Sequence, residues 1–163
     1  MREIVSDTGA LITLEKMRDG YSFIQKLYSK IIVPPKVLEE VSFHYGSSQN
    51  YLKKYDIVHL IDVDGDFSIA KANGMEDLDG GESEAISLAL KLNLDLLIEE
   101  DLGRQVAKRL GIKIAGIGGV VYKAWKMGII AKKEALNKMQ EIFDKKRLDL
   151  VTYQALIQKI LSK

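Results

Sequence analysis

The sequence predicts an α/β domain with helices on both sides of a mainly parallel sheet. Short apolar strands alternate with amphipathic helices along the chain, which is the pattern of a three-layer α/β/α sandwich. The chain has 163 residues, enough for one domain with a buried core and short for two. We therefore expect a single domain over residues 1–163, of which 131–163 form a C-terminal helical extension.

The predicted strands are short runs rich in aliphatic residues. The run at 31–33 is the clearest, because consecutive β-branched residues suit a strand that is buried on both faces. Pro34 ends this run, and Pro35 suits the first turn of a helix. In chain order, strands are predicted at 4–6, 31–33, 57–63 (as an edge or connecting strand), 95–98 and 113–115.

The predicted helices carry apolar residues at helical spacing. The strongest follows the turn Asp79-Gly80-Gly81 and continues to Leu92. The polar and aromatic stretch at 43–55 is interpreted as a helix and a loop. The other predicted helices lie at 8–14, 21–27, 35–41, 103–110, 117–127, from 132 onward, and at 151–161, with a further turn or two at 67–74.

Composition excludes several kinds of protein. The net charge is +1, so nucleic-acid binding requires a local basic face rather than a global field. There is no cysteine, which excludes disulfides, thiolate zinc sites and cysteine nucleophiles. The N-terminus lacks the pattern of a signal peptide, and no apolar run approaches the ~20 residues that span a bilayer. We expect a soluble, cytoplasmic protein with no membrane partner.

Acidic residues fall where the predicted strands end and where neighbouring helices begin. In open parallel sheets, ligands bind outside the carboxyl ends of the strands. Carboxylates brought together there repel one another, and a divalent cation held by oxygen ligands relieves the repulsion. Taken singly, Glu82 also suits a helix N-terminus and Asp7 a helix cap. The acids at these positions are Asp7, Glu39, Glu40, Glu82, Glu84, Glu99, Glu100 and Asp101.

Five segments resemble, in order and spacing, the motifs of PIN domains. Residues 5–12 resemble the family's opening, and 33–41 resemble its second motif, whose acid falls on Glu40. Residues 78–86 resemble the Gly-Glu-x-Glu-Ala motif of a prokaryotic subgroup. Residues 97–107 match the segment that carries the last acid, and 116–120 resemble a Gly-x-x-Gly element. The resemblance runs from residue 2 to about residue 130.

The resemblance implies a divalent-metal-dependent ribonuclease, often the toxin of a toxin–antitoxin pair. Asp7 would bind Mg²⁺ or Mn²⁺ directly, together with Glu82 and one of the acids after the strand at 95–98. Thr8 would hydrogen-bond a water or a phosphate. Glu40 would complete the acidic floor and orient the attacking water. The catalytic set is therefore predicted as Asp7, Glu40, Glu82 and Glu100, and the metal set as Asp7, Glu82, Glu99, Glu100 and Asp101.

The last acid stays open among three neighbours, because PIN domains usually have an aspartate where this chain has Glu99-Glu100-Asp101. Counting back from Val106-Ala107 favours Glu99, and counting forward from Glu82 favours Glu100. This departure supports an alternative function, a catalytically degenerate PIN-like module that binds RNA or protein. A receiver-type phosphoacceptor domain is disfavoured, because it requires an acidic pair after the first strand.

The expected partners are single-stranded or structured RNA, an antitoxin protein and a second copy of the chain. Four basic residues are predicted to flank the acids, where they could contact RNA phosphates, although a solvated helix face explains them equally. They are Arg104, Lys108, Arg109 and Lys113. Of these, Arg104 is the predicted substrate-binding residue beside Thr8. Tyr21, Phe23, Phe43 and Tyr45 are predicted to line a helical layer that could accept an antitoxin helix.

Overall fold

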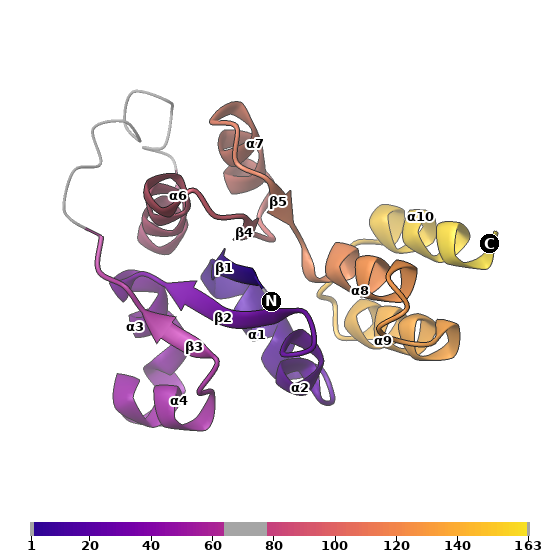
Figure 1. Ribbon diagram of the computed structural model, residues 1–163, viewed down its shortest axis with the longest axis horizontal. Helices are drawn as coiled ribbons and strands as arrows, with labels where there is room; N and C mark the ends of the chain where they lie inside the picture. Colours follow the sequence, from indigo (N-terminus) through magenta and orange to yellow (C-terminus); the bar gives the residue numbers. More distant parts are fainter. Residues whose placement is uncertain (1, 64–77, 163) are drawn as a thin grey trace.

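Five parallel strands form the centre of the fold in the computed structural model, which describes residues 2–63 and 78–162 (Figure 1). The strands are β1 (Arg2–Ser6), β2 (Tyr28–Val33), β3 (Val58–Leu60), β4 (Leu96–Leu97) and β5 (Ile114–Ala115). Their order in the sheet is β3-β2-β1-β4-β5. β1 pairs with β2 along most of its length, placing Ile4 opposite Ile31, and pairs with β4 on its other side. The predicted mainly parallel sheet is confirmed.

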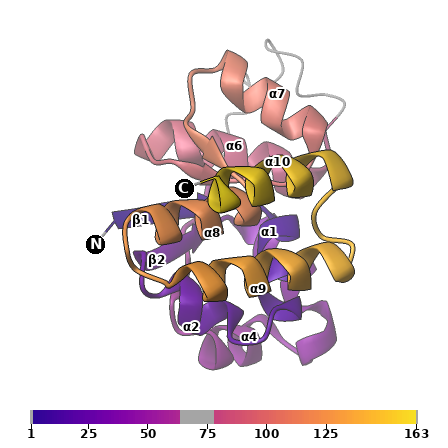
Figure 2. The ribbon, with the colours of Figure 1, turned by 90° about the vertical axis from the view of Figure 1, so that its right-hand side faces the viewer.

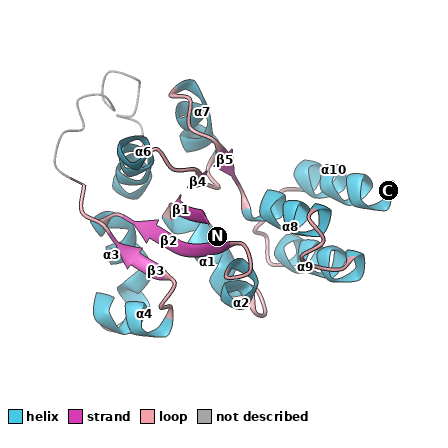
Figure 3. Ribbon diagram, in the orientation of Figure 1, coloured by secondary structure: helices cyan, strands magenta, loops and turns pink. Residues whose placement is uncertain are grey.

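Helices cover both faces of this sheet (Figure 3). The last three residues of both β1 and β2 are buried, and successive strand residues point to opposite faces, so each face must be covered. The predicted α/β/α sandwich is therefore confirmed. The helices of the described residues are α1 (Thr8–Lys16), α2 (Gly20–Ile24), α3 (Pro35–Ser42), the 3₁₀ turn η1 (Phe43–Tyr45), α4 (Ser48–Lys54), α6 (Gly80–Leu92), α7 (Asp101–Arg109), α8 (Ile117–Lys126), α9 (Lys132–Asp144) and α10 (Leu150–Leu161).

Residues suited to helix ends determine where several of these helices begin. Asp7 caps α1 and Asp79 caps α6, and each side chain accepts a hydrogen bond from the backbone N–H three residues later. Pro35 is the first residue of α3, where its missing N–H leaves no hydrogen bond unmade. Asn93 ends α6 with φ 53°, a left-handed conformation that asparagine tolerates.

Some element boundaries differ from those predicted. The helix predicted over 21–27 ends at Ile24, because the chain must extend again to begin β2 at Tyr28. β4 has two residues rather than four. The helix predicted from Gly103 begins at Asp101, so the acids after β4 already belong to a helix start. The stretch at 43–55 contains η1 and α4, as expected, and the turns predicted at 67–74 lie outside the described residues.

The three last helices pack on one another beside the sheet (Figures 1 and 2). α8 also contacts α1, and it therefore joins this group to the rest of the fold. α9 buries Ala135, Met139 and Ile142, whereas Ile160 is the buried residue of α10. α10 is thus the least covered of the three. In the part of the chain that the structure describes, no helix has the length and apolar character needed to cross a bilayer.

Candidate active site

The carboxyl ends of β1 and β4 meet at one edge of the sheet, and an acidic residue follows each. The Asp7 N–H donates to the Leu97 carbonyl over 2.9 Å, which continues the pairing beyond the last residue of β1. The Glu99 N–H in turn donates to Asp7 Oδ2 over 3.2 Å. Because they follow adjacent parallel strands, these two acids, 92 residues apart in sequence, lie side by side.

Asp7 is enclosed by protein, with 1% of its surface exposed. Its Oδ1 accepts a hydrogen bond from the Ala10 N–H over 2.8 Å, as the cap of α1. Burial raises the pKa of Asp7 from 3.8 to about 7, although the N–H groups of Ala10 and Glu99 act in the opposite direction. A carboxyl group in this environment favours either a bound proton or a bound cation.

Glu99 faces the start of α8 as well as Asp7. Its Oε1 accepts a hydrogen bond from the Ile117 N–H over 2.9 Å, where the positive end of the helix dipole favours a carboxylate. Burial raises the pKa of Glu99, and the Ile117 N–H, Arg147 and Arg104 partly offset this effect. Arg104 is held in place by a 2.8 Å hydrogen bond from its Nη1 to the Ile98 carbonyl.

Glu82 brings a third acid from the first turn of α6. Asp79, which caps this helix, accepts a hydrogen bond from the Glu82 N–H over 2.8 Å. Burial raises the pKa of Glu82 from 4.5 to about 8, and the carboxylates of Asp79, Glu100 and Asp7 raise it further. Glu82 therefore lies within electrostatic reach of the residues that follow both β1 and β4.

Two glycines leave room for the acidic side chains beside α6. A Cβ at Gly81 would lie 2.3 Å from Glu40 Oε1 and 3.2 Å from Thr8 Oγ1. A Cβ at Gly103, in the first turn of α7, would lie 2.6 Å from Glu82 Oε2. Side chains from α1, α3 and α6 therefore converge beside the start of α7, and each glycine provides the space that a carboxylate occupies.

Thr8 and Glu40 lie on the more open side of this cluster. Glu40 is exposed, and partial burial of its carboxyl group raises the pKa of Glu40, as does Asp79, whereas the nearby Thr8 hydroxyl lowers it. The Thr8 hydroxyl oxygen is itself buried, and it completes no hydrogen bond of normal geometry among residues 2–63 and 78–162. This hydroxyl group therefore keeps unused hydrogen-bonding capacity beside Glu40.

The structure separates the three acids that follow β4. Glu99 lies against Asp7 and the start of α8, whereas Glu100 is exposed at the residue before α7, near Glu82, and its side chain makes no capping hydrogen bond. Asp101 is exposed in the first turn of α7 and has no hydrogen bond or ion pair with another described residue. The geometry therefore brings Glu99 and Glu100 toward the cluster from different sides, and the role of each remains a prediction.

Two residues near the acids were missed from the sequence. The sequence pattern predicts only a turn at Asp79, although an aspartate three residues before Glu82 is a typical helix cap. No sequence pattern around Arg147 indicates that it lies near the acids. It lies in the connection between α9 and α10 and hydrogen-bonds to Gly9 and Thr13, which places its charge near Glu99. Only the tertiary structure reveals this position.

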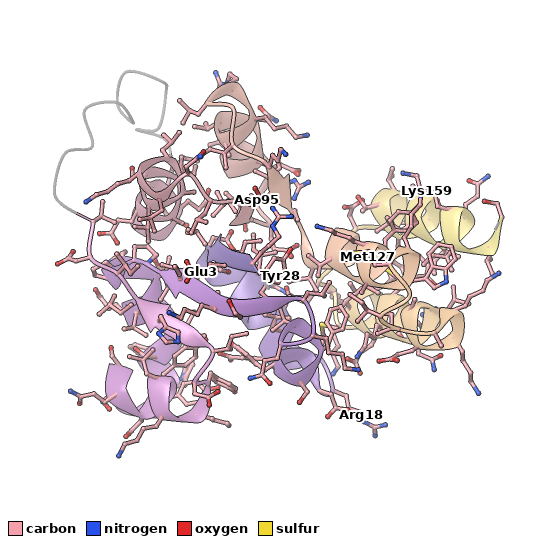
Figure 4. All side chains as sticks on the ribbon, viewed as in Figure 1. Glu3, Arg18, Tyr28, Asp95, Met127 and Lys159 are labelled. Carbon is pink, nitrogen blue, oxygen red and sulfur yellow. The ribbon has the colours of Figure 1, made fainter. Side chains whose placement is uncertain are left out.

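The prediction that Lys108, Arg109 and Lys113 flank the acids is wrong. α7 runs back along the sheet, so its last turn, which carries Lys108 and Arg109, lies near the starts of the strands. Lys108 and Lys113 line a depression with Tyr28, the first residue of β2, and Asp95, which precedes β4. Figure 4 labels Tyr28 and Asp95. These lysines therefore lie at the edge of the sheet opposite the acids.

The donor set suits a hard divalent cation, because every candidate ligand atom is an oxygen. As the side chains stand, no three Asp, Glu or His residues of the described ranges are grouped closely enough to hold a metal ion. Asp7 and Glu82 nevertheless both have pKa values raised by burial, so a bound cation would stabilise both carboxylates. Glu82 and Glu100 have long side chains that can reach an ion by rotation about their χ angles.

Comparisons with known proteins give a family and a fold. A family model described as DUF3368, a PIN domain, matches residues 3–162. Among solved structures, the chain is similar to a PilT N-terminus domain protein, SSO1118, from the hyperthermophilic archaeon Sulfolobus solfataricus P2. The sequence identity is 22% and the TM-score 0.50, and the match covers 72% of this chain and 87% of that one. At this identity the likeness shows the fold alone. No curated protein matches the sequence.

Proposed function

Because the chain belongs to the PIN-domain family, whose members are generally nucleases, we propose that it is a divalent-metal-dependent endoribonuclease that cleaves RNA phosphodiester bonds. The family predicted from the motifs is thereby confirmed, while the Gly-Glu-x-Glu-Ala subgroup remains a prediction. PIN domains generally use divalent metals, and we propose Mg²⁺ or Mn²⁺, since both accept carboxylate ligands and keep several waters.

The convergence of acids from remote segments carries this proposal. Asp7 follows β1, Glu99 follows β4 and Glu82 opens α6, yet Asp7 accepts a hydrogen bond from Glu99 and contributes to the raised pKa of Glu82. Burying several carboxylates together is unfavourable for stability. Such an arrangement at the carboxyl ends of parallel strands is typical of a site that binds a cation or a substrate.

Asp7 and Glu82, with Glu99 or Glu100, are the residues that would hold the ion. Once bound, a divalent ion supplies a water of lowered pKa and stabilises negative charge on the phosphate. Asp7 is fixed by two backbone N–H donors, so its free lone pairs point in a defined direction. Glu40 lies on the open side, where its carboxylate can orient a water, and the Thr8 hydroxyl can donate to that water or to a phosphate oxygen.

Cleavage of RNA by the purified protein tests the proposal. With Mn²⁺ or Mg²⁺ present, the wild-type protein should cut single-stranded RNA internally, and Asp7→Asn should abolish the cleavage with the fold intact. Asp56→Asn is the matched control. Asp56 is an exposed aspartate just before β3, and it therefore lies at the amino ends of the strands, away from the acids. Equal cleavage by wild type and Asp7→Asn would show that the activity comes from another site or from a contaminant.

A non-catalytic binding module is the second candidate. It is favoured by one observation, that within the described residues no three acids are grouped closely enough to hold a metal ion. Calorimetric titration separates the two candidates. Heat of binding that appears with Mn²⁺ in the wild-type protein and is lost in Asp7→Asn supports the nuclease, whereas an absence of binding at millimolar Mn²⁺ supports the binding module.

We extend the same proposal to partners and to the role of the protein in the cell. The toxin role, an antitoxin partner, a homodimer and a cytoplasmic location all belong to it. Phe43, which is 78% exposed in η1, offers an apolar contact for an antitoxin helix, and α10 exposes Leu150, Val151 and Leu161 for a second copy of the chain. Light scattering of the purified protein would test the dimer, and co-purification with the product of a neighbouring gene would test the antitoxin.

A further inference from the structure

Arg147 connects the C-terminal part of the chain to the neighbourhood of the acidic cluster, which consists of Asp7, Glu82, Glu99 and Glu100. It lies in the connection between α9 and α10, and its side chain extends to the first helix of the fold. Arg147 Nη2 donates to the Gly9 carbonyl over 2.9 Å, and Nε donates to Thr13 Oγ1 over 2.9 Å. These partners are 138 and 134 residues away in sequence, so the contacts depend on the complete fold.

The backbone at the end of α9 turns sharply to bring Arg147 into this position. Lys146 adopts φ 60°, a left-handed conformation that is unfavourable for a non-glycine residue. The turn is closed by two hydrogen bonds, from the Lys146 N–H to the Phe143 carbonyl over 3.0 Å and from the Arg147 N–H to the Ile142 carbonyl over 2.8 Å. Arg147 is therefore held in position both by its backbone hydrogen bond and by the hydrogen bonds of its side chain.

The guanidinium group lies beside the carboxylates but does not form a close ion pair with them. A methyl group at Gly9 would lie 3.7 Å from Arg147 Nη2, 3.8 Å from Asp7 Oδ2 and 3.5 Å from Glu99 Cβ. The space in front of the Gly9 Cα is therefore bordered by Arg147 and by both acids. Arg147 Nη1 has no hydrogen bond to any other described residue, so one side of the guanidinium fork keeps its donors free.

A depression of about 710 Å³ opens next to this guanidinium group. Its lining joins residues of the acidic cluster, Glu99 among them, to Phe143, Lys146 and Arg147. The carboxylates that line the depression outnumber its two basic side chains. Without a bound cation, the depression would therefore carry a net negative charge and repel nucleic acid. Within it, Arg147 offers planar donors that suit a phosphate. The Phe143 ring stacks on Tyr153 with 4.3 Å between the ring centroids, so at most its other face could receive a base.

From this geometry we propose that Arg147 binds a phosphate of the single-stranded nucleic acid substrate, next to the phosphate that is cleaved. The inference rests on the proposed nuclease function and names one further substrate-binding residue for it. It also makes the segment 131–163 part of the active site. The segment supplies a side chain that lines the same depression as Glu99 and Glu100, along which the substrate strand would continue.

Binding of a short fluorescein-labelled single-stranded RNA, measured by anisotropy in Mg²⁺ over a range of salt concentrations, tests the inference. The reference protein is Glu40→Gln, which keeps the proposed metal ligands and should bind without cutting, and Arg147→Gln is added to it. We expect the affinity to fall about tenfold and the slope of log K against log[salt] to become shallower by about 0.7, as expected for one lost phosphate contact on a single strand. Lys132→Gln, at the distant start of α9, is the control and should change neither quantity.

Arg147→Gln also loses contacts to Gly9 and Thr13, so its fold is checked by circular dichroism. If it does not fold, Arg147→Lys replaces it, because lysine keeps the charge and loses the fork. The expected result is then a several-fold weaker affinity with an unchanged salt slope. Unchanged affinity in the folded Arg147 variant, or no RNA binding by Glu40→Gln, would overturn the inference. RNA cleavage by the wild-type protein is measured separately, so failure of the nuclease proposal is recognised independently.

Discussion

Replacing Asp7 with asparagine should stabilise the metal-free protein at alkaline pH. The Asp7 side chain is 1% exposed, and its pKa is raised from 3.8 to about 7, chiefly by burial. A raised carboxyl pKa means that the folded protein holds this proton more tightly than the unfolded chain does. Stability from this group is therefore fully present below about pH 4 and is lost as the pH rises through about 7.

The magnitude follows from the two pKa values. A tenfold change in proton affinity corresponds to about 1.4 kcal/mol, so ionised Asp7 destabilises the metal-free fold by about 4 kcal/mol. About 2.5 kcal/mol of this develops between about pH 5 and pH 8. Asparagine carries no charge, but its amide cannot accept hydrogen bonds from both Ala10 and Glu99, and this costs about 1 kcal/mol at every pH.

Urea unfolding of both proteins in EDTA, at several pH values in this range, measures the effect. The free energy of unfolding of Asp7→Asn minus that of wild type should increase with pH by about 2.5 kcal/mol. Asp56→Asn should show no such trend, because Asp56 is exposed. A difference between Asp7→Asn and wild type that stays constant over the whole pH range would refute the reasoning, since the stability would then not depend on a buried carboxylate.

Two further predictions concern the glycines and the metal. Gly103→Ala should lower the free energy of unfolding by about 1–3 kcal/mol and reduce cleavage, because its Cβ would meet the packed Ile98 Cδ1 at 2.7 Å. Gly81→Ala should reduce cleavage with little effect on urea unfolding, because the exposed Glu40 can move away; equal stability losses in the two variants would contradict this. The affinity for Mn²⁺ by calorimetry should increase as the pH rises through about 7 to 8, where Asp7 and Glu82 lose their protons, and an affinity independent of pH would argue against these ligands.

Local sequence was sufficient to predict the fold class and to place most of the acids at strand ends and helix starts. β-branched runs mark strands whatever their partners are, and Pro35 and Asp79 lie at helix starts for reasons confined to their own neighbourhood. Strand ends in a parallel sheet share one edge, so Asp7 and the acids after β4 were expected together. Local sequence could not decide which of Glu99, Glu100 and Asp101 faces Asp7. The three residues are consecutive after β4, so counting residues places all of them near the same edge of the sheet.

The sequence by itself thus determined an α/β domain of the PIN type with acids at the ends of its strands. The tertiary structure alone decided which groups face one another, because side-chain direction depends on packing between segments far apart in the chain. It directed Glu99 toward Asp7 and Ile117, placed Lys108 and Lys113 at the opposite edge, and brought Arg147 to Gly9. No periodicity or motif near residue 147 encodes that contact, since it depends on how α9 packs against α8 and on the left-handed turn at Lys146.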